Sequence, residues 1–342
     1  MKLSRRQLLQ FSSYWGLGLL TDSFLLRPRL VQAELLSETP LTMQLDWKFN
    51  VQFAGLLMAE GAGLYADREV VVELLPWESG IVVPEVVAAN PGTIGCAEQN
   101  LILEAQAAGA PIKVLATMLQ SSPLGLMTLP DAGITTLEDL VSLKVGMHVD
   151  GLAVMELVQG VSGFDPGAIE VVEIPYEDKY DRLLSGELAA IQCYAVDEPI
   201  GFKSQYGIEP IMLKLADYGY EAYAQVIFAH NDLIESSPEE VSGFLQATFG
   251  GWSMALADIP SAAAEVVANY VEPGSKYEDV TYQTQSLELI AEYMLLGIEP
   301  AALGTIDSDR WMRMAQRFVE YGIIDTAPEQ ADSLATRFWP AG

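Results

Sequence analysis

The sequence predicts an α/β protein of two lobes, in which the second lobe is inserted into the first. Between residues 41 and 125, β-branched apolar runs alternate with segments of helical spacing, a pattern typical of a parallel sheet covered by helices on both faces. A second series of this kind begins at Lys144. After about residue 230 the chain is mostly helical, and this last part is assigned to the first lobe.

One β-loop-α-β unit, residues 43–80, organises the first lobe. Residues 43–47 alternate between apolar and polar side chains, which predicts a strand. Helical spacing follows at 54–66, after a polar turn with aromatic residues at both ends. Residues 70–75 are apolar and β-branched enough for a buried parallel strand.

The remaining elements are predicted from the same kinds of pattern. Further strands are expected at 92–96, 112–119, 124–129, 145–148, 169–174, 189–194 and 225–229. Helices are expected at 84–89, 99–108, 152–161, 180–185, 238–257, 261–270, 282–296 and 309–321, and one more begins at Thr136, which is followed by acids in the first turn. This layout places residues 41–125 and 226–330 in lobe one and 126–225 in lobe two. The two crossovers form a hinge, and the ligand lies between the lobes.

The N-terminus has the features of an export signal. Ser4-Arg5-Arg6 begins a twin-arginine pattern, an apolar stretch occupies 11–20, and Val31-Gln32-Ala33 offers small residues before a cleavage site. The apolar run is shorter than the roughly 20 residues that span a bilayer. We therefore expect residues 1–33 to be a cleaved signal and the mature protein to be periplasmic. The alternative is an uncleaved N-terminal anchor.

The charge of the chain excludes one class of partner. The whole chain has a formal net charge of −29, and the first 33 residues contain five basic residues and one acidic residue. The mature chain is therefore four charges more negative than the whole. Such a surface repels phosphate backbones, so we expect no nucleic-acid binding. A halotolerant or well-solvated surface also explains this charge.

Cysteine and histidine are too few for a predicted metal site. Cys96 and Cys193 are the two cysteines, and they fall in different predicted lobes. Two free, buried thiols are favoured over a disulfide that would lock the lobes together. With His148 and His230 as the two histidines and no His/Cys cluster, no metal is expected. The sequence also lacks a phosphate-binding Gly-rich loop and a Gly-x-Ser-x-Gly motif.

Four stretches of the sequence match, in their order and spacing, stretches found in a known family of proteins. They are Leu45-Asp46-Trp47 with Asn50, residues 61–65, residues 217–223 with 231–234, and residues 307–311 with 321–324. The chain thus resembles the periplasmic solute-binding proteins of ABC importers. More narrowly, it resembles the group that binds pyrimidine precursors of thiamine, such as formylaminopyrimidine and hydroxymethylpyrimidine.

This resemblance implies the type II periplasmic-binding-protein fold, with two lobes, parallel-rich sheets and a two-strand hinge. It also implies a monomer without a cofactor that delivers a small heterocycle to permease and ATPase subunits at the inner membrane. Relatives that bind riboflavin or sulfonates share the scaffold, so these solutes remain alternatives.

The same superfamily includes an enzyme branch that makes the pyrimidine from its own histidine and a pyridoxal cofactor. The histidine of that branch corresponds to a place near Leu101, and this chain has no His before Val145. The Cys-rich run of that branch is replaced by Ala222-Tyr223-Ala224-Gln225-Val226. These departures favour a binding protein over an enzyme.

The first lobe supplies four candidate ligand contacts. Trp47, Asn50 and Trp77 lie at or beyond the carboxyl ends of two predicted strands, where open α/β sheets bind ligands. Two indoles and an amide suit a flat ring that bears heteroatoms. Glu98, after the strand at 92–96, is a further candidate. The alternatives are packing for the indoles and a turn position for Asn50.

The second lobe and the hinge supply the remaining candidates. The resemblance places Glu198, with Asp197 beside it, at an acidic ligand contact of the family, where a carboxylate accepts two hydrogen bonds from an aminopyrimidine. The alternative is an acid at a helix start. Trp77 and one of Tyr194, Tyr220 or Tyr223 are expected to sandwich the ring. His148 is interpreted as structural.

Overall fold

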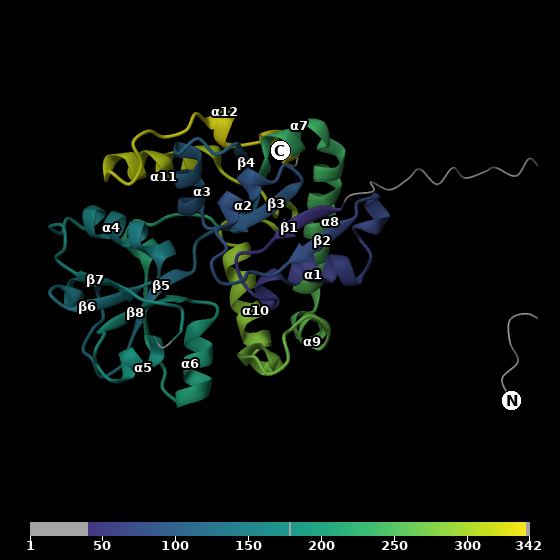
Figure 1. The fold of residues 1–342 in the computed structure, drawn as a ribbon. Coiled ribbons are helices and arrows are strands. Elements are labelled where there is room, and N and C mark those ends of the chain that lie inside the picture. The colour runs from purple at the N-terminus through teal and green to yellow at the C-terminus, as the bar shows by residue number, and fades with distance from the viewer. Residues whose placement is uncertain (1–39, 178, 340–342) are drawn as a thin grey trace, which may run out of the picture. The chain divides into compact units, whose positions relative to one another are not determined.

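The computed structural model describes residues 40–177 and 179–339, so the predicted signal at 1–33 lies outside the described residues. The described chain forms two five-stranded sheets (Figure 1). In chain order, the strands are β1 (Leu41–Gln44), β2 (Val72–Leu75), β3 (Thr93–Ala97), β4 (Ile112–Leu119), β5 (Leu124–Thr128), β6 (Lys144–Met147), β7 (Glu170–Glu173), β8 (Ala190–Tyr194), β9 (Ile211–Lys214) and β10 (Ala224–His230).

The strand order shows how the chain passes between the sheets. The first sheet has the order β2-β1-β3-β10-β4, and the second has the order β7-β6-β8-β5-β9. The chain enters the second sheet at β5 and returns to the first at β10. This topology agrees with the predicted α/β fold of two lobes. The exact lobe boundaries at 125/126 and 225/226 stay predictions.

Both sheets are mixed and combine the predicted parallel pairs with antiparallel ones. The pairs β1–β2, β1–β3, β6–β7 and β6–β8 are parallel, as strand-helix alternation predicts. By contrast, β10 is antiparallel to β3 and β4, and β5 is antiparallel to β8 and β9. The antiparallel strands are those that connect the two sheets, because each enters its sheet from the other one.

Helices cover the sheets. They are α1 (Ala54–Gly61), α2 (Val83–Ala89), α3 (Gln99–Ala107), α4 (Leu152–Val161), α5 (Lys179–Leu184), α6 (Glu198–Tyr206), α7 (Asn231–Ser236), α8 (Pro238–Ala257), α9 (Ile259–Asn269), α10 (Val280–Met294), α11 (Ser308–Glu320) and α12 (Gln330–Ser333). The helix expected to begin at Thr136 is a single 3-10 turn, Leu137–Leu140, with the predicted cap. Neither α6 nor β9 was predicted. Within the described residues, no helix is long and apolar enough to cross a membrane.

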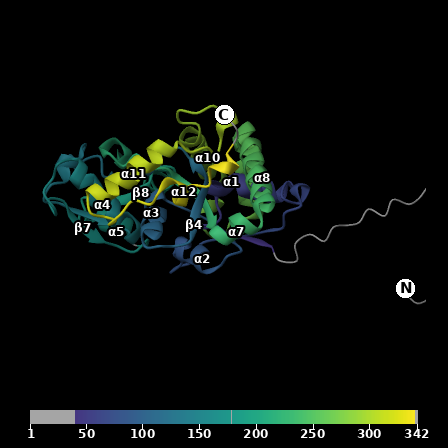
Figure 2. The ribbon, with the colours of Figure 1, turned by 90° about the horizontal axis from the view of Figure 1, so that it is seen from above.

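The first sheet is buried on both faces. Along β10, Ile227 and Ala229 belong to a core cluster with α1 and α8, whereas Val226 and Phe228 belong to a second cluster on the opposite face. That second cluster also holds Trp311 of α11 together with residues of α4 and the second sheet. In Figures 1 and 2, α11 lies close to α4. Helix α11 therefore packs against residues of both sheets.

Candidate functional site

A cavity of about 90 Å³ lies where the carboxyl ends of strands from both sheets meet. This volume is several times the roughly 10–15 Å³ that one water molecule needs by the same measure. The first sheet and its loops contribute Asp46, Trp47, Gln52, Glu98 and Gln225 to the lining. The lining is completed by Leu124, His148, Asp150, Tyr176, Gln192, Cys193, Tyr194, Asp197 and Glu198. This is the position expected for a ligand in an open α/β sheet.

Two carboxyl groups from the first lobe line this cavity, those of the half-buried Asp46 and the buried Glu98. Asp46 follows β1, and its oxygens accept hydrogen bonds of 3.1 and 3.0 Å from Gln225 Nε2. Glu98 follows β3 and accepts hydrogen bonds from the hydroxyls of Tyr194, at 2.7 Å, and Ser122, at 2.8 Å. Burial raises the pKa of Asp46 to about 7 and that of Glu98 to about 8. Both groups therefore titrate near neutral pH.

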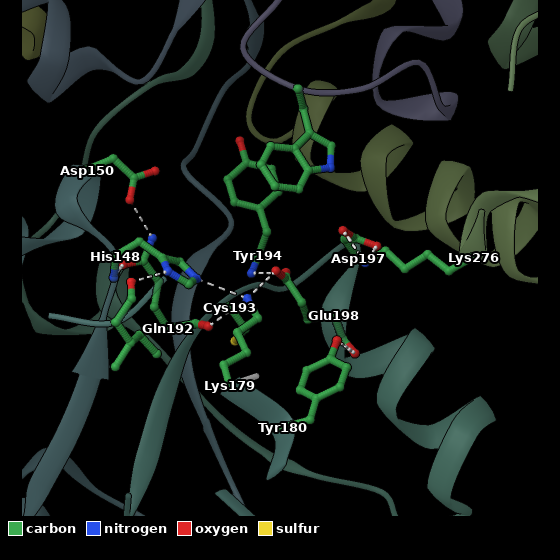
Figure 3. A network of polar contacts seen from close by, with 12 residues as sticks. His148, Asp150, Lys179, Tyr180, Gln192, Cys193, Tyr194, Asp197, Glu198 and Lys276 are labelled. Carbon is green, nitrogen blue, oxygen red and sulfur yellow. Dashed lines mark hydrogen bonds and ion pairs between the residues drawn. The ribbon is translucent and has the colours of Figure 1, made fainter. Parts of the chain in front are cut away.

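Glu198 has a different environment, shown in Figure 3. Lys179 Nζ donates to its Oε1 at 2.6 Å, and the Tyr194 backbone N–H donates to its Oε2 at 2.6 Å. Burial alone would raise the pKa of Glu198, but the nearby Lys179 and Lys276 ammonium groups and these hydrogen bonds outweigh it and lower the pKa to about 2. Glu198 is therefore an ionised carboxylate with a partner already on each oxygen.

His148 belongs to the same network. Its Nδ1 lies 3.1 Å from the Ile174 carbonyl oxygen, to which it donates, and its Nε2 accepts from Lys179 Nζ at 3.1 Å. Burial and the adjacent Lys179 cation lower the pKa of His148. Both ring nitrogens of this neutral imidazole are thus engaged, although the residue also lines the cavity, and its structural role stays a prediction.

Aromatic rings close one side of the cavity. Trp47 stacks on Trp77 with ring centroids 5.2 Å apart and lies 5.2 Å from the Tyr176 ring. Tyr176 in turn stacks on His148 at 4.2 Å. Trp47 and Trp77 come from the first lobe, and Tyr176 follows β7 of the second. Flat ring faces from both lobes are therefore available to a planar ligand.

A groove of about 480 Å³ adjoins the cavity and shares Trp47, Tyr176 and Glu198 with it. Trp77 also lines this groove. Three of the eight lysines of the chain, Lys48, Lys179 and Lys276, stand in its wall. The groove therefore carries the cationic side chains near the site, whereas carboxyl groups dominate the cavity.

A chain of hydrogen bonds joins the cavity to α10 across the two lobes. Trp47 Nε1 donates to the Tyr277 hydroxyl at 2.6 Å, and that hydroxyl donates to Asp197 at 3.0 Å. Lys276 Nζ lies 3.0 Å from the same carboxylate. Asp197 directly precedes α6 of the second lobe, and Tyr277 precedes α10. An aromatic residue of the site is thus coupled to a contact between the lobes.

The structure brings together five of the eight predicted contacts. Trp47, Glu98, Tyr194 and Glu198 line the cavity, and Trp77 shares the adjoining groove with Glu198. Whether they contact a ligand stays a prediction.

The other three predicted residues lie elsewhere. Asn50 caps the turn Val51–Phe53 by accepting from the Gln52 N–H at 2.7 Å. The Tyr220 hydroxyl donates to Asn100 in the core at 2.9 Å, and the Tyr223 hydroxyl accepts from the Asp307 N–H at 2.9 Å. Their side chains already serve the fold, which is why they are absent from the cavity wall.

Four important residues were not predicted as contacts: Asp46, Tyr176, Lys179 and Gln225. Asp46 and Tyr176 each follow a strand of a predicted series, so the rule that selected Trp47 would have found them. By contrast, Gln225 lies inside a strand, and no local pattern shows that its side chain faces a cavity. Cys96 and Cys193 are both free and buried, as expected. Among the described residues, no cluster could hold a metal ion.

The sequence is similar to those of known proteins. A model of the NMT1/THI5-like family matches residues 50–263, which is more than half of the chain. The chain belongs to the NMT1/THI5-like family. A 4-amino-5-hydroxymethyl-2-methylpyrimidine phosphate synthase of Legionella pneumophila is 25% identical to this NMT1/THI5-like protein over 222 residues, covering 62% of this chain and 67% of that protein. The riboflavin-binding protein RibY of Chloroflexus aurantiacus is 22% identical over 316 residues, covering 88% and 86%.

Solved structures support the fold. The periplasmic aliphatic sulphonate binding protein SsuA from Escherichia coli superposes with a TM-score of 0.66 at 13% identity, covering 89% of this chain and 94% of SsuA. The NMT1/THI5-like protein therefore has the periplasmic-binding-protein fold. At this identity, the likeness concerns the fold alone.

Proposed function

We propose that this protein is the solute-binding component of an ABC importer and that it captures a small, flat, amine-bearing heterocycle, most closely a pyrimidine precursor of thiamine. The observation that carries the proposal is the cavity between the lobes, where ring faces of Trp47 and Tyr176 accompany the carboxyl groups of the half-buried Asp46 and the buried Glu98. Aromatic faces suit a planar ring, and carboxyl groups suit its amine edge.

The charge of the lining argues for this solute over a sulfonate. Among the described residues, the cavity is lined by five carboxyl side chains, those of Asp46, Glu98, Asp150, Asp197 and Glu198, and by no Lys or Arg. Lys179 and Lys276 lie behind this lining and are paired with Glu198 and Asp197. An anionic sulfonate would be repelled by the ionised members of this set, whereas an amine would be attracted.

A flavin is the second candidate. The relative named a riboflavin-binding protein aligns with most of this chain, and a groove of about 480 Å³ adjoins the cavity. A three-ring flavin would have to occupy both spaces and therefore to separate Trp47 from Tyr176, whose centroids lie 5.2 Å apart. A single pyrimidine ring needs less space.

An enzyme of pyrimidine synthesis is disfavoured. Several relatives are named as synthases, but the histidine that marks the enzyme branch has no counterpart near Leu101, and both nitrogens of His148 are hydrogen-bonded. Incubating the protein with pyridoxal phosphate and measuring its mass tests this directly. We expect no loss of mass at a histidine, and such a loss would establish the enzyme.

Isothermal titration calorimetry of the mature protein tests the proposed function. We expect 4-amino-5-hydroxymethyl-2-methylpyrimidine or its formylamino analogue to bind with micromolar or tighter Kd, and an alkanesulfonate to give no saturable heat. Saturable binding of riboflavin or the sulfonate, with no heat from either pyrimidine, would contradict the proposal.

Export is also proposed, from the twin-arginine pattern at Ser4-Arg5-Arg6. Fractionation of the host, followed by N-terminal sequencing of the mature protein, measures it. A mature chain that begins after Ala33 in the periplasm is expected.

Glu198→Ala is expected to abolish binding and to reduce stability. The substitution leaves the Lys179 ammonium buried without its carboxylate, which costs about 3–5 kcal/mol. Glu209→Ala, which removes an exposed partner of Lys203, is the matched control and should change stability by less than about 1 kcal/mol. Calorimetry and urea unfolding measure the two effects. Unchanged affinity and stability in Glu198→Ala would remove Glu198 from the site.

A further inference from the structure

Gln225 has two unusual features at the cavity wall. It is a non-glycine residue with a φ of +50°, in the left-handed region, although it lies within strand β10. Its side chain is almost completely buried, with 1% exposure, and lines the cavity. A long side chain is rarely held in this backbone conformation, and such residues cluster at ligand sites.

The two ends of the Gln225 amide are used unequally. Its Nε2 donates to both oxygens of Asp46, at 3.1 and 3.0 Å. Its Oε1 is buried and has no hydrogen-bond partner among the described residues. Turning the amide over would sacrifice both bonds to Asp46, so the geometry keeps the carbonyl oxygen in place. A buried acceptor without a partner is uncommon in native structures and calls for a ligand or water.

The neighbours of Gln225 indicate which kind of ligand group would form a hydrogen bond with its Oε1. Asp46 beside it is an acceptor when ionised, and Glu98 nearby is approached by hydroxyl donors on both of its oxygens. This wall of the first lobe therefore offers oxygen atoms to a ligand. A ring edge with an amine presents N–H groups to them, whereas a ring edge with a carbonyl presents another oxygen.

We propose that Gln225 determines ligand specificity by accepting an N–H of the ligand at Oε1, so that the site selects an amine-bearing ring over the same ring bearing a carbonyl. This inference rests on the proposed function and names the group by which the solute is chosen. Two effects produce the discrimination. An amine would donate a hydrogen bond to the buried Gln225 Oε1, whereas a ligand carbonyl would place its own oxygen against that oxygen.

The test compares two compounds that differ at one position. Calorimetry measures Kd for 4-amino-5-hydroxymethyl-2-methylpyrimidine and for its 4-oxo analogue, with wild type and Gln225 variants. We expect wild type to prefer the amine by about 10- to 100-fold. Gln225→Met, of similar length but without the acceptor, should reduce this preference at least tenfold, mainly by weakening the amine compound. Gln225→Glu keeps an acceptor and should keep the preference.

Two controls keep the result interpretable. Gln159→Met removes another buried amide, which is bonded to Met155 and Ile169 in the second lobe and does not line the cavity; it should leave the preference unchanged. If Gln225→Met does not fold, Gln225→Asn replaces it, because Asn tolerates a positive φ and draws the carbonyl back by one methylene. It should likewise lose the preference.

The outcomes separate the two proposals. Binding of neither pyrimidine by wild type would overturn the proposed function and this inference with it. Binding of both compounds, with a preference that Gln225→Met or Gln225→Asn leaves unchanged, would overturn the inference alone. A wild type that prefers the 4-oxo analogue would also overturn it.

Discussion

At the residue scale, the site combines carboxyl groups whose pKa values are shifted in opposite directions. Among the described residues, Asp46 and Glu98 have amide, thiol or hydroxyl donors but no cation within hydrogen-bond distance, and burial raises the pKa of each to near or above neutral. The Glu198 side chain is also largely buried, but Lys179 holds it ionised. The first pair can change protonation on binding, whereas the third carboxylate cannot do so at physiological pH.

Asp46 should make the stability of the protein depend on pH. Its pKa is about 7 in the folded chain and near 3.8 when unfolded, so between these values the folded state binds more protons. Its contribution is fully present below about pH 4 and is lost as pH rises through about 7, at roughly 1.4 kcal/mol for each pH unit between the two pKa values. Asp46→Asn should therefore be more stable than wild type at pH 9 and lose most of that advantage on acidification to about pH 4, as measured by urea unfolding at pH 9 and pH 4. An equal difference at both pH values would contradict this account.

At the element scale, the sequence predicted the regular elements better than their directions. Strands such as β3 and β4 and the long helix α8 follow from apolar runs and helical spacing. The antiparallel direction of β5 and β10 does not, because it depends on which sheet the chain enters next.

Some missed elements still carried local signals. Helix α6 begins at Glu198 and has Pro199 in its first turn, a favourable start that was weighed as the alternative for Glu198 rather than as a helix. Within the site, the strand-end rule located Trp47, Glu98 and Tyr194 at the cavity. It could not show that Lys179 forms an ion pair with Glu198, because that pair depends on how α5 and α6 pack.

The contact between α1 and α8 should tolerate one glycine substitution and not another. A Cβ at Gly251 would stand 2.0 Å from the Gly55 carbonyl oxygen, which is backbone and cannot move aside locally. Gly251→Ala should force the helices apart and cost about 1–3 kcal/mol or more in unfolding free energy. At Gly250, one residue earlier in α8, a Cβ would meet only the flexible end of Leu64 at 3.3 Å.

Gly250→Ala is the matched control and should be neutral or stabilising by up to about 1 kcal/mol, because Ala favours helix. Thermal denaturation of both variants measures the difference. Equal melting temperatures would show that the helices do not approach as closely as the structure places them.

At the scale of the whole molecule, the site lies on the contact that holds the lobes together. Tyr277 bonds both Trp47 in the cavity and Asp197 at the start of α6. Nearby, the Tyr282 hydroxyl donates to the Asp197 carbonyl at 3.2 Å, and the Ser286 hydroxyl donates to the Val196 carbonyl at 2.5 Å. Binding at Trp47 and closure of the lobes are therefore expected to favour each other.

Tyr277→Phe should weaken closure while keeping the aromatic ring. It removes the acceptor of Trp47 Nε1 and a donor to Asp197, so we expect ligand affinity to fall about 5- to 30-fold, mainly through faster dissociation. Stopped-flow tryptophan fluorescence measures the dissociation rate. Tyr282→Phe, which loses one bond to the Asp197 backbone carbonyl and none to Trp47, should have a smaller effect. A larger effect from Tyr282→Phe would mean that coupling does not pass through Trp47.

A crystal structure of the mature protein with 4-amino-5-hydroxymethyl-2-methylpyrimidine tests the central claim most directly. We predict the ring in contact with the aromatic rings of Trp47 and Tyr176, with its amine directed at Asp46 and Gln225. A ligand bound outside this cavity, or one whose amine points away from the oxygen atoms of the first lobe, would contradict the account.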